Sequence, residues 1–121
     1  MATNYVREGC TINYTNSGSA ISSGGVVVVG KQIGIALTDI AATTGTGELA
    51  MEGVFTVPKV SAAVIAKGEN VIWDASAGAF DDNAATPATG DVSNCCIAWE
   101  AAGAGVTAIK VKINVGIGTV T

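Results

Sequence analysis

Residues 106–115, VTAIKVKINV, decide the class of fold. Apolar and polar side chains alternate along this stretch with a period of two, which predicts a β-strand. Just before it, Gly103, Gly105 and Ala108 match the loose form of the dinucleotide-binding pattern G-x-G-x-x-G/A. That pattern needs a helix after its glycines, so that the helix N-terminus can face a pyrophosphate. A strand follows instead, and we predict a hairpin turn here. TGTGE at 44–48 is also followed by a predicted strand and receives the same interpretation.

On the N-terminal side of this stretch, short strand patterns recur with little predicted helix between them. VVVVG at 26–30 is β-branched throughout, which is typical of a strand buried on both faces. VSAAVIAKGE at 60–69 is the one helical candidate, with Gly68 at the C-cap position. Further strands are predicted in 10–15, 31–39, 49–57, 70–78 and 95–101, with a loop over 80–94. This spacing excludes a βαβ architecture and predicts an all-β fold with one short helix.

The length of 121 residues suits one domain. We expect a single β domain over 10–121, preceded by an N-terminal arm over 1–9. The sequence also indicates a weak internal repeat, since Ile35-Ala36 and Ile97-Ala98 are each predicted to lie mid-strand, followed by Asp39 and Glu100. Two related β-units would form a small β-sandwich or β-barrel, and a jelly-roll-like arrangement is one form of it.

Charged residues make up only 13% of the chain, and the net charge is −4. Either a partner or further copies cover part of the surface, or a monomer is coated with Thr, Ser, Asn and Gly. The six Lys and Arg are scattered, and only Lys110 and Lys112 could form a small patch, which argues against direct nucleic-acid binding. With no apolar leader and no run long enough to span a bilayer, we expect no membrane association and synthesis in a cytoplasm.

Cys10, Cys95 and Cys96 do not form a disulfide framework, because their number is odd and two of them are adjacent. Neighbouring residues of a strand point to opposite faces, so a bridge between Cys95 and Cys96 would be strained. We predict buried free thiols in a reducing compartment.

The search for catalytic groups predicts no enzyme, no cofactor and no metal site. The chain has no His, which removes the commonest general base and metal ligand and leaves the cysteines without an activating partner. Several acidic groups are more readily explained as surface carboxylates than as a cation site or a carboxylate pair: Asp81, Asp82 and Asp91; Glu48 and Glu52; Asp39 and Glu100. Trp73 and Trp99 are predicted to be core or interface anchors rather than sugar platforms.

Five segments in order carry a family resemblance: MATNYVREG, GGVVVVGKQIGIALTD, EGVFTVPK, KGENVIWDASAG and IAWEAAGAGVTAIKVKIN. Together they resemble the capsid cement, or decoration, proteins of tailed bacteriophages, from Ala2 to about Asn114. The Cys95-Cys96 pair departs from the pattern, where such chains often have a small apolar residue. The resemblance implies a structural virion protein on the outer surface of an icosahedral head, tying neighbouring major capsid subunits together as a dimer or trimer.

The resemblance also implies an extended N-terminal arm that lies along the shell or a neighbouring copy. In this sequence the contact residues would be Thr3, Asn4, Tyr5, Val6 and Arg7. Other classes remain open: a tail-tube or fibre subunit, a ligand-binding β-sandwich, or a hydrolase that uses only Asp and Glu. The last would need two carboxylates converging in a cleft.

Overall fold

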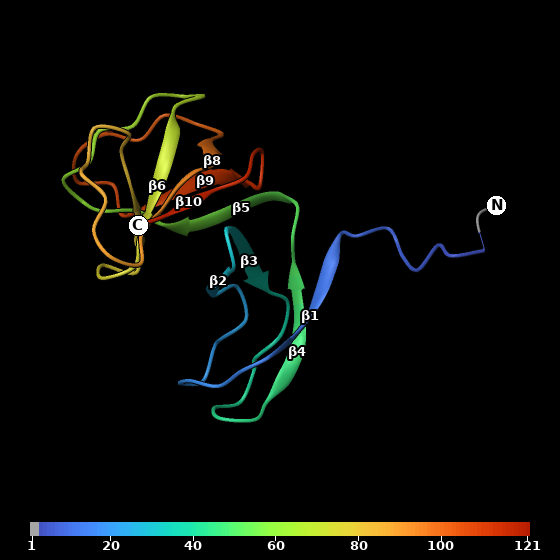
Figure 1. The fold of residues 1–121 in the computed structure, drawn as a ribbon. Helices are drawn as coiled ribbons and strands as arrows, with labels where there is room; N and C mark the ends of the chain where they lie inside the picture. The colour runs from blue at the N-terminus through green and yellow to red at the C-terminus, as the bar shows by residue number, and fades with distance from the viewer. Residues whose placement is uncertain (1–2) are drawn as a thin grey trace.

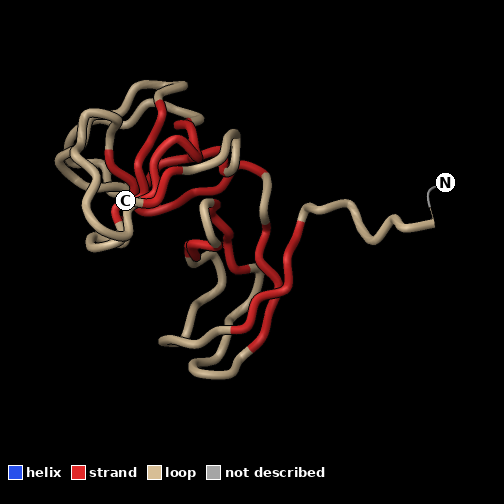
Figure 2. The backbone as a smooth tube through the Cα atoms, viewed as in Figure 1, coloured by secondary structure: helices blue, strands red, loops and turns tan. Residues whose placement is uncertain are grey.

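The computed structural model describes residues 3–121, and within them the chain forms ten β-strands and no helix (Figures 1 and 2). None of the described residues therefore forms a helix that could cross a membrane. The first four strands are β1 (Thr11–Thr15), β2 (Val26–Val29), β3 (Gln32–Ala36) and β4 (Thr46–Ala50). The others are β5 (Gly53–Pro58), β6 (Asn70–Asp74), β7 (Ala79–Asp81), β8 (Val92–Ala98), β9 (Ala108–Ile113) and β10 (Thr119–Val120). The all-β expectation is confirmed.

The first sheet has the order β1-β4-β3-β2, and all its pairs are antiparallel. A two-residue turn joins β2 to β3, and Gly30 takes the positive φ of 59° that such a turn requires. β3 has one bulky and one small face, as its alternation predicts. The buried apolar side chains form two clusters, a larger one that reaches into the second sheet and a smaller one that lies within the first. Ile33 and Ile35 belong to the larger cluster. On the other face of β3, Gly34 lets Leu49 approach so closely that a Cβ added to the glycine would lie 2.8 Å from the Leu49 Cδ1.

The expectation that 26–30 is buried on both faces is only half right. Val26 and Val28 pack against the larger cluster, while Val27 and Val29 pack against the smaller one, so both faces do touch apolar neighbours. Only Val27 is fully buried, however, because β2 is the edge strand of its sheet.

The second sheet has the order β5-β9-β8-β6-β7, with β10 paired to β8. A parallel bridge between Lys59 and Phe80 joins its two ends, and the Val60 N–H donates to the Phe80 carbonyl at 2.9 Å. The sheet therefore closes into a small barrel. Each sheet uses one continuous part of the chain, 11–50 or 53–120, so the strands do not interleave as they do in a jelly roll.

The alternating stretch at 106–115 contains β9, which forms part of the barrel wall. Ile109, Val111 and Ile113 of β9 are at most 1% exposed, while Lys110 and Lys112 point outward. The larger cluster continues from these residues to Ile33, Ile35 and Ala50 of the first sheet. One apolar core thus spans both sheets.

The short helix predicted over 60–69 is wrong. Ile65 instead forms an antiparallel bridge with Ala102, and the two residues exchange backbone hydrogen bonds of 2.8 and 2.9 Å. Turns surround this bridge, and Gly68 has a φ of +83°. Tertiary pairing has overridden an Ala-rich local preference for helix that was only two turns long.

Two other boundaries differ from expectation. The strand predicted over 49–57 is split at Met51 and Glu52, where the chain passes from the first sheet to the second, and Gly53 with φ 122° makes the bend. The predicted loop over 80–94 is shorter, because β7 and β8 extend into it at either end. The two halves of the predicted internal repeat are alike only locally. Ile35-Ala36 lies at the end of β3 and Ile97-Ala98 at the end of β8, but these strands belong to sheets of different size.

Residues 3–10 form no strand and contain only a turn at 3–4 and a bend at 9–10. Figure 1 shows this segment leading away from both sheets toward the N-terminus. Such a path does not establish an extended arm over 1–9, of which residues 1–2 lie outside the described part of the chain. The arm remains a prediction.

Candidate functional site

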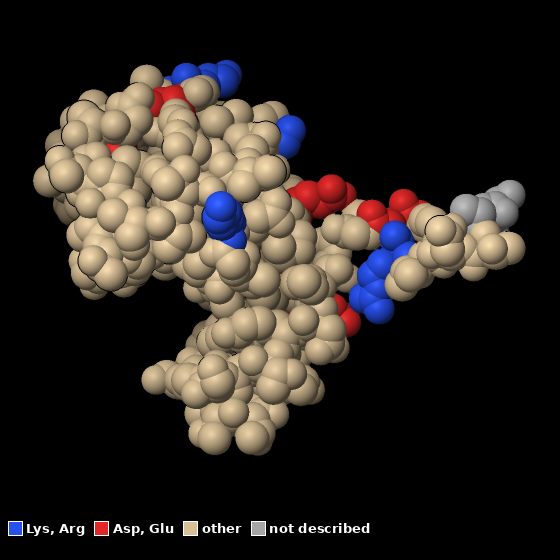
Figure 3. Space-filling model, viewed as in Figure 1, with Lys and Arg blue, Asp and Glu red and all other residues tan. Residues whose placement is uncertain are grey.

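The first candidate surface is the N-terminal segment, where the five predicted contact residues lie. Thr3, Asn4, Tyr5, Val6 and Arg7 are all exposed, and Val6 reaches 83%. The Tyr5 hydroxyl donates to the Glu8 carboxylate at 2.8 Å, and this hydrogen bond raises the pKa of Tyr5 above its usual value. Figure 3 shows cationic and acidic atoms side by side on this projecting segment. The segment thus offers an apolar side chain flanked by charge, without contributing to either core cluster.

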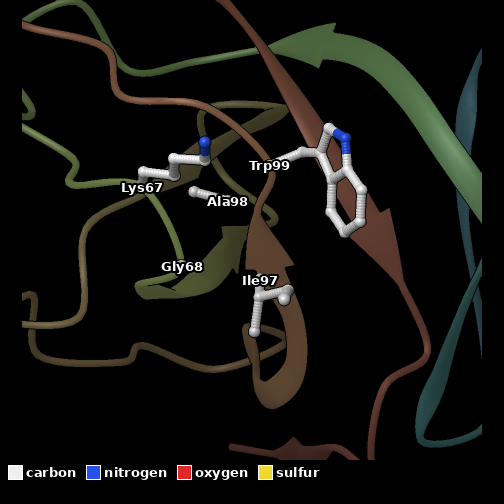
Figure 4. Close-up of a pocket in the computed structure, with 5 residues that line it drawn as sticks. All are labelled: Lys67, Gly68, Ile97, Ala98 and Trp99. Atoms are coloured by element: carbon white, nitrogen blue, oxygen red, sulfur yellow. The ribbon is translucent and has the colours of Figure 1, made fainter.

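The second candidate surface is a hollow of about 260 Å³ beside Trp99 (Figure 4). It is lined by Lys67, Gly68, Ile97, Ala98 and Trp99. Figure 4 shows the indole on one side and the Lys67 side chain on the other. Its lining suits an apolar side chain of a partner, with one cation at its border.

Neighbouring strands hold the indole in place. The backbone N–H of Trp99 donates to the Lys110 carbonyl at 2.8 Å, and the Lys112 ammonium lies 5.7 Å from the centroid of the indole ring. At this distance a lysine is attracted to the π-face of the ring. Lys110 in turn forms a 3.6 Å ion pair with Glu100. Lys110 and Lys112, the two cations that could have formed a patch, both face outward on β9, but each already has a neighbour.

The structure separates the two tryptophans that the sequence treated alike. Trp73 is 8% exposed and meets Phe80 edge-to-face at 5.1 Å, so it anchors the barrel core. Trp99 is 48% exposed. An aromatic ring of that exposure, held by its neighbours, is the kind of residue that dominates protein interfaces.

The acidic candidates do not converge. Glu48 of β4 pairs with Asn13 of β1, whereas Glu52 lies between β4 and β5. Asp39 lies in the connection between β3 and β4, and Glu100 lies in the connection between β8 and β9. Asp39 accepts a hydrogen bond from the Ser23 N–H at 2.8 Å. Among residues 3–121, no group of three or more His, Cys, Asp or Glu side chains is arranged to hold a metal ion.

Asp91 corrects the expectation of a solvated acidic loop. It is 4% exposed and accepts hydrogen bonds from the Ala75 and Ala88 N–H groups, at 3.0 and 2.9 Å. Asp81 and Asp82 do bond to their own loop, through the Asp82 and Ala84 N–H groups. These carboxylates therefore shape the 82–91 loop.

The glycine pattern at 103–108 contains a turn, whereas most of TGTGE at 44–48 belongs to β4, which corrects the second turn prediction. Gly105 has a φ of +89°, and its N–H donates to the Ser61 carbonyl at 2.7 Å, so the segment folds back on residue 61 before β9 begins. Gly45 directly precedes β4, whereas Gly47 lies inside that strand, opposite Tyr14 of β1. Neither pattern precedes a helix, as the alternation after Gly105 predicted.

The cysteines are free, but they are not all buried. Cys95 and Cys96 lie in the larger cluster, and the Cys95 thiol donates to the Asn114 Oδ1 at 3.0 Å. Both side chains are at most 1% exposed, and Asn94, with φ 65°, lies just before them in β8. Hydrogen bonding with Cys95 and burial raise the pKa of the Cys96 thiol. Cys10 is exposed, which corrects the prediction, because it lies before β1 begins.

We expect one of the three thiols to react in the native protein. A disulfide reagent should label Cys10 alone, and all three cysteines after unfolding. A hydrogen bond with Glu52 raises the pKa of Cys10, so labelling at neutral pH should be slower than for a free thiol and should speed up as the pH rises. Glu52→Gln should increase the rate at neutral pH, and Cys10→Ser should abolish native labelling. Labelling that persists in Cys10→Ser would contradict the burial of the other two.

No curated protein matches the chain. A family model matches the chain over both candidate surfaces, apart from Thr3, Asn4 and Tyr5, and over all strands except β10. A family model described as "Phage cement protein" matches residues 6–113, and the chain belongs to that family.

Proposed function

We propose that this protein binds the outer surface of an icosahedral phage head and cements neighbouring major capsid subunits, without catalysing a reaction. The observation that carries the proposal is the family match over residues 6–113. In this proposal the protein is made in the host cytoplasm, acts on the virion as a homo-oligomer, and needs neither nucleic acid nor membrane.

The two candidate surfaces support this role in different ways. The N-terminal segment presents Val6 at 83% exposure and Tyr5 at 57%, and we propose that residues 3–7 contact the shell or a neighbouring copy. A short segment that orders on a partner gains backbone hydrogen bonds, with its side chains setting the register. Trp99 offers a second, preformed contact. Many such contacts repeated over one shell would give strong attachment even where each is weak.

The test is co-sedimentation with expanded phage heads stripped of this protein. We expect saturable binding at a copy number comparable to that of the capsid subunits. Deleting residues 2–8 should abolish binding while the β domain stays folded. Absence of binding by a folded protein would overturn the capsid role and favour a tail-tube or fibre subunit.

A matched pair of substitutions separates the segment from general surface effects. Val6→Asp should weaken shell binding by about tenfold or more, since it places a charge where an apolar contact is proposed. Val64→Asp makes the same change at a residue of 65% exposure on the barrel and should leave binding unaltered. Equal effects from the two, or unchanged binding after the deletion, would remove residues 3–7 from the contact.

A further inference from the structure

The edge strand β2 is poorly protected against pairing with another strand. It pairs with β3 on one side only, and Figure 1 shows it at the margin of the first sheet. Its four residues are all valine, and it is flanked by Gly25 and Gly30. Exposed edges usually carry a charge or a proline that blocks pairing, and β2 carries neither.

The hydrogen-bond pattern shows which backbone groups of β2 are open. The Ala36 N–H donates to the Gly25 carbonyl at 2.9 Å, and antiparallel ladders bond every second residue. Val27 and Val29 therefore direct their backbone groups toward β3, whereas Val26 and Val28 direct theirs outward. Within residues 3–121, no strand pairs with this outer side of β2.

We propose that β2 pairs antiparallel with β2 of a second copy of this chain, with Val27 on the two-fold axis. Val26 then exchanges two hydrogen bonds with Val28 of the partner subunit, and Val28 exchanges two with the partner's Val26. This register uses every open donor and acceptor of the strand. The two four-stranded sheets become one continuous sheet across the axis.

A second copy fits this edge better than a charged partner does. Residues 11–50 contain only three charged side chains, Lys31, Asp39 and Glu48, and none lies on β2. In the view of Figure 3 the first sheet presents few charged atoms. Two such edges meet without like-charge repulsion, and a two-fold contact requires a surface that is complementary to itself. Val26, Val28 and Val29, half-buried in one chain, would be covered further by the same residues of the partner.

This inference names the contact of the homo-oligomer in the proposed function, but it is tested in solution without phage heads, so its failure would leave the binding to the capsid untouched. The first measurement is light scattering of the purified full chain. We expect twice the monomer mass of 11.9 kDa at micromolar concentration. A monomeric or trimeric mass would overturn the proposal, since β2–β2 pairing closes at two copies.

A disulfide tests the register. In the proposed pairing the two Val27 Cα atoms form a pair without mutual hydrogen bonds, at about 4.5 Å, within the range of about 4.4–6.8 Å that a disulfide spans. In a Cys10→Ser background, which removes the exposed thiol, Val27→Cys should form a covalent dimer on mild oxidation. Val29→Cys is the matched control: it faces the same cluster, but the two copies of residue 29 would lie about 13 Å apart along the strand and should not link. Equal linking by both variants would overturn the register.

Proline variants test the edge without depending on the cysteines. Val28→Pro removes an outward N–H while leaving the bonds to β3 in place, so it should keep the fold and lose the dimer. Asn13→Pro makes the same change on the opposite edge, β1, where the 10–51 and 16–45 hydrogen bonds show that residue 13 points outward. It should remain dimeric. A dimer that survives Val28→Pro but is lost in Asn13→Pro would assign the contact to β1 and overturn the proposal; should Val28→Pro unfold, the Val27→Cys result decides.

Discussion

Replacing Asn114 by Ala is expected to lower the free energy of unfolding by about 4 kcal/mol, because this side chain ties the two sheets together. Its Nδ2 donates to the Ile33 carbonyl at 2.7 Å and the Met51 carbonyl at 2.6 Å. Its Oδ1 accepts from the Ile33 N–H at 2.9 Å. A net hydrogen bond is worth about 1 kcal/mol, and a buried group left without a partner costs about 1–3 kcal/mol. Urea unfolding measures the change.

Asn94→Ala is the matched control for this experiment. Asn94 has a positive φ of 65°, close to the 56° of Asn114. Both variants therefore lose the tolerance of Asn for the left-handed conformation, which Ala does not share. Its side chain, however, is exposed and makes only longer contacts, 3.4 Å to Asn70 and 3.3 Å to Thr119. We expect it to cost about 1–2 kcal/mol. If Asn114→Ala costs no more than Asn94→Ala, the bridge between the sheets contributes nothing.

Lys59→Met is expected to lower the free energy of unfolding by about 3 kcal/mol. Lys59 is 3% exposed, and its ammonium donates to the carbonyls of Val60, Gly103 and Val106 at 2.8, 3.1 and 3.1 Å. Methionine fills a similar volume but removes this donor. The Val60 and Gly103 carbonyls then keep only the Ala63 and Val106 N–H groups, at 3.1 and 3.3 Å, and the Val106 carbonyl keeps no donor in the described structure. The ammonium holds the 103–106 turn against the end of β5, so amide exchange at Gly105 should also become faster.

Lys31→Met serves as its control, because Lys31 is an exposed lysine on the β2–β3 turn with no side-chain hydrogen bond in the described structure. A substitution of that kind stays within about 0.5 kcal/mol. Similar stability of the two variants would show that the buried ammonium is worth no more than an apolar side chain of the same length.

The elements that sequence predicts well are those decided by short-range alternation. In β9 apolar and polar side chains alternate, and in β3 large and small ones do, so each pattern can be read from consecutive residues of the sequence. The turn after Gly103 is also local. The helix over 60–69 fails because Ile65 is paired with Ala102, a partner 37 positions away that no local preference reveals.

The groups that join distant segments have the weakest sequence signal. Lys59 follows Pro58 and looks like a surface lysine; its burial depends on carbonyls 44 and 47 positions later in the chain. Asn114 continues the polar phase of Lys110 and Lys112, so alternation points it outward, and only its positive φ turns it toward the first sheet. Trp73 and Trp99 have similar flanks and differ only in what the rest of the fold places over them.

Because residues 11–50 carry few charges, an assembly held together by the first sheet should respond little to the salt concentration and pH of its surroundings. Salt weakens contacts between exposed charges, and protonation changes those made by carboxylates, but neither acts on backbone hydrogen bonds between valines. Ions that are excluded from protein surfaces, such as sulfate, strengthen apolar burial. An assembly held by the first sheet would therefore keep its strength from dilute fresh water to brine, while contacts made through Arg7, Lys67 or Glu100 would vary with salinity.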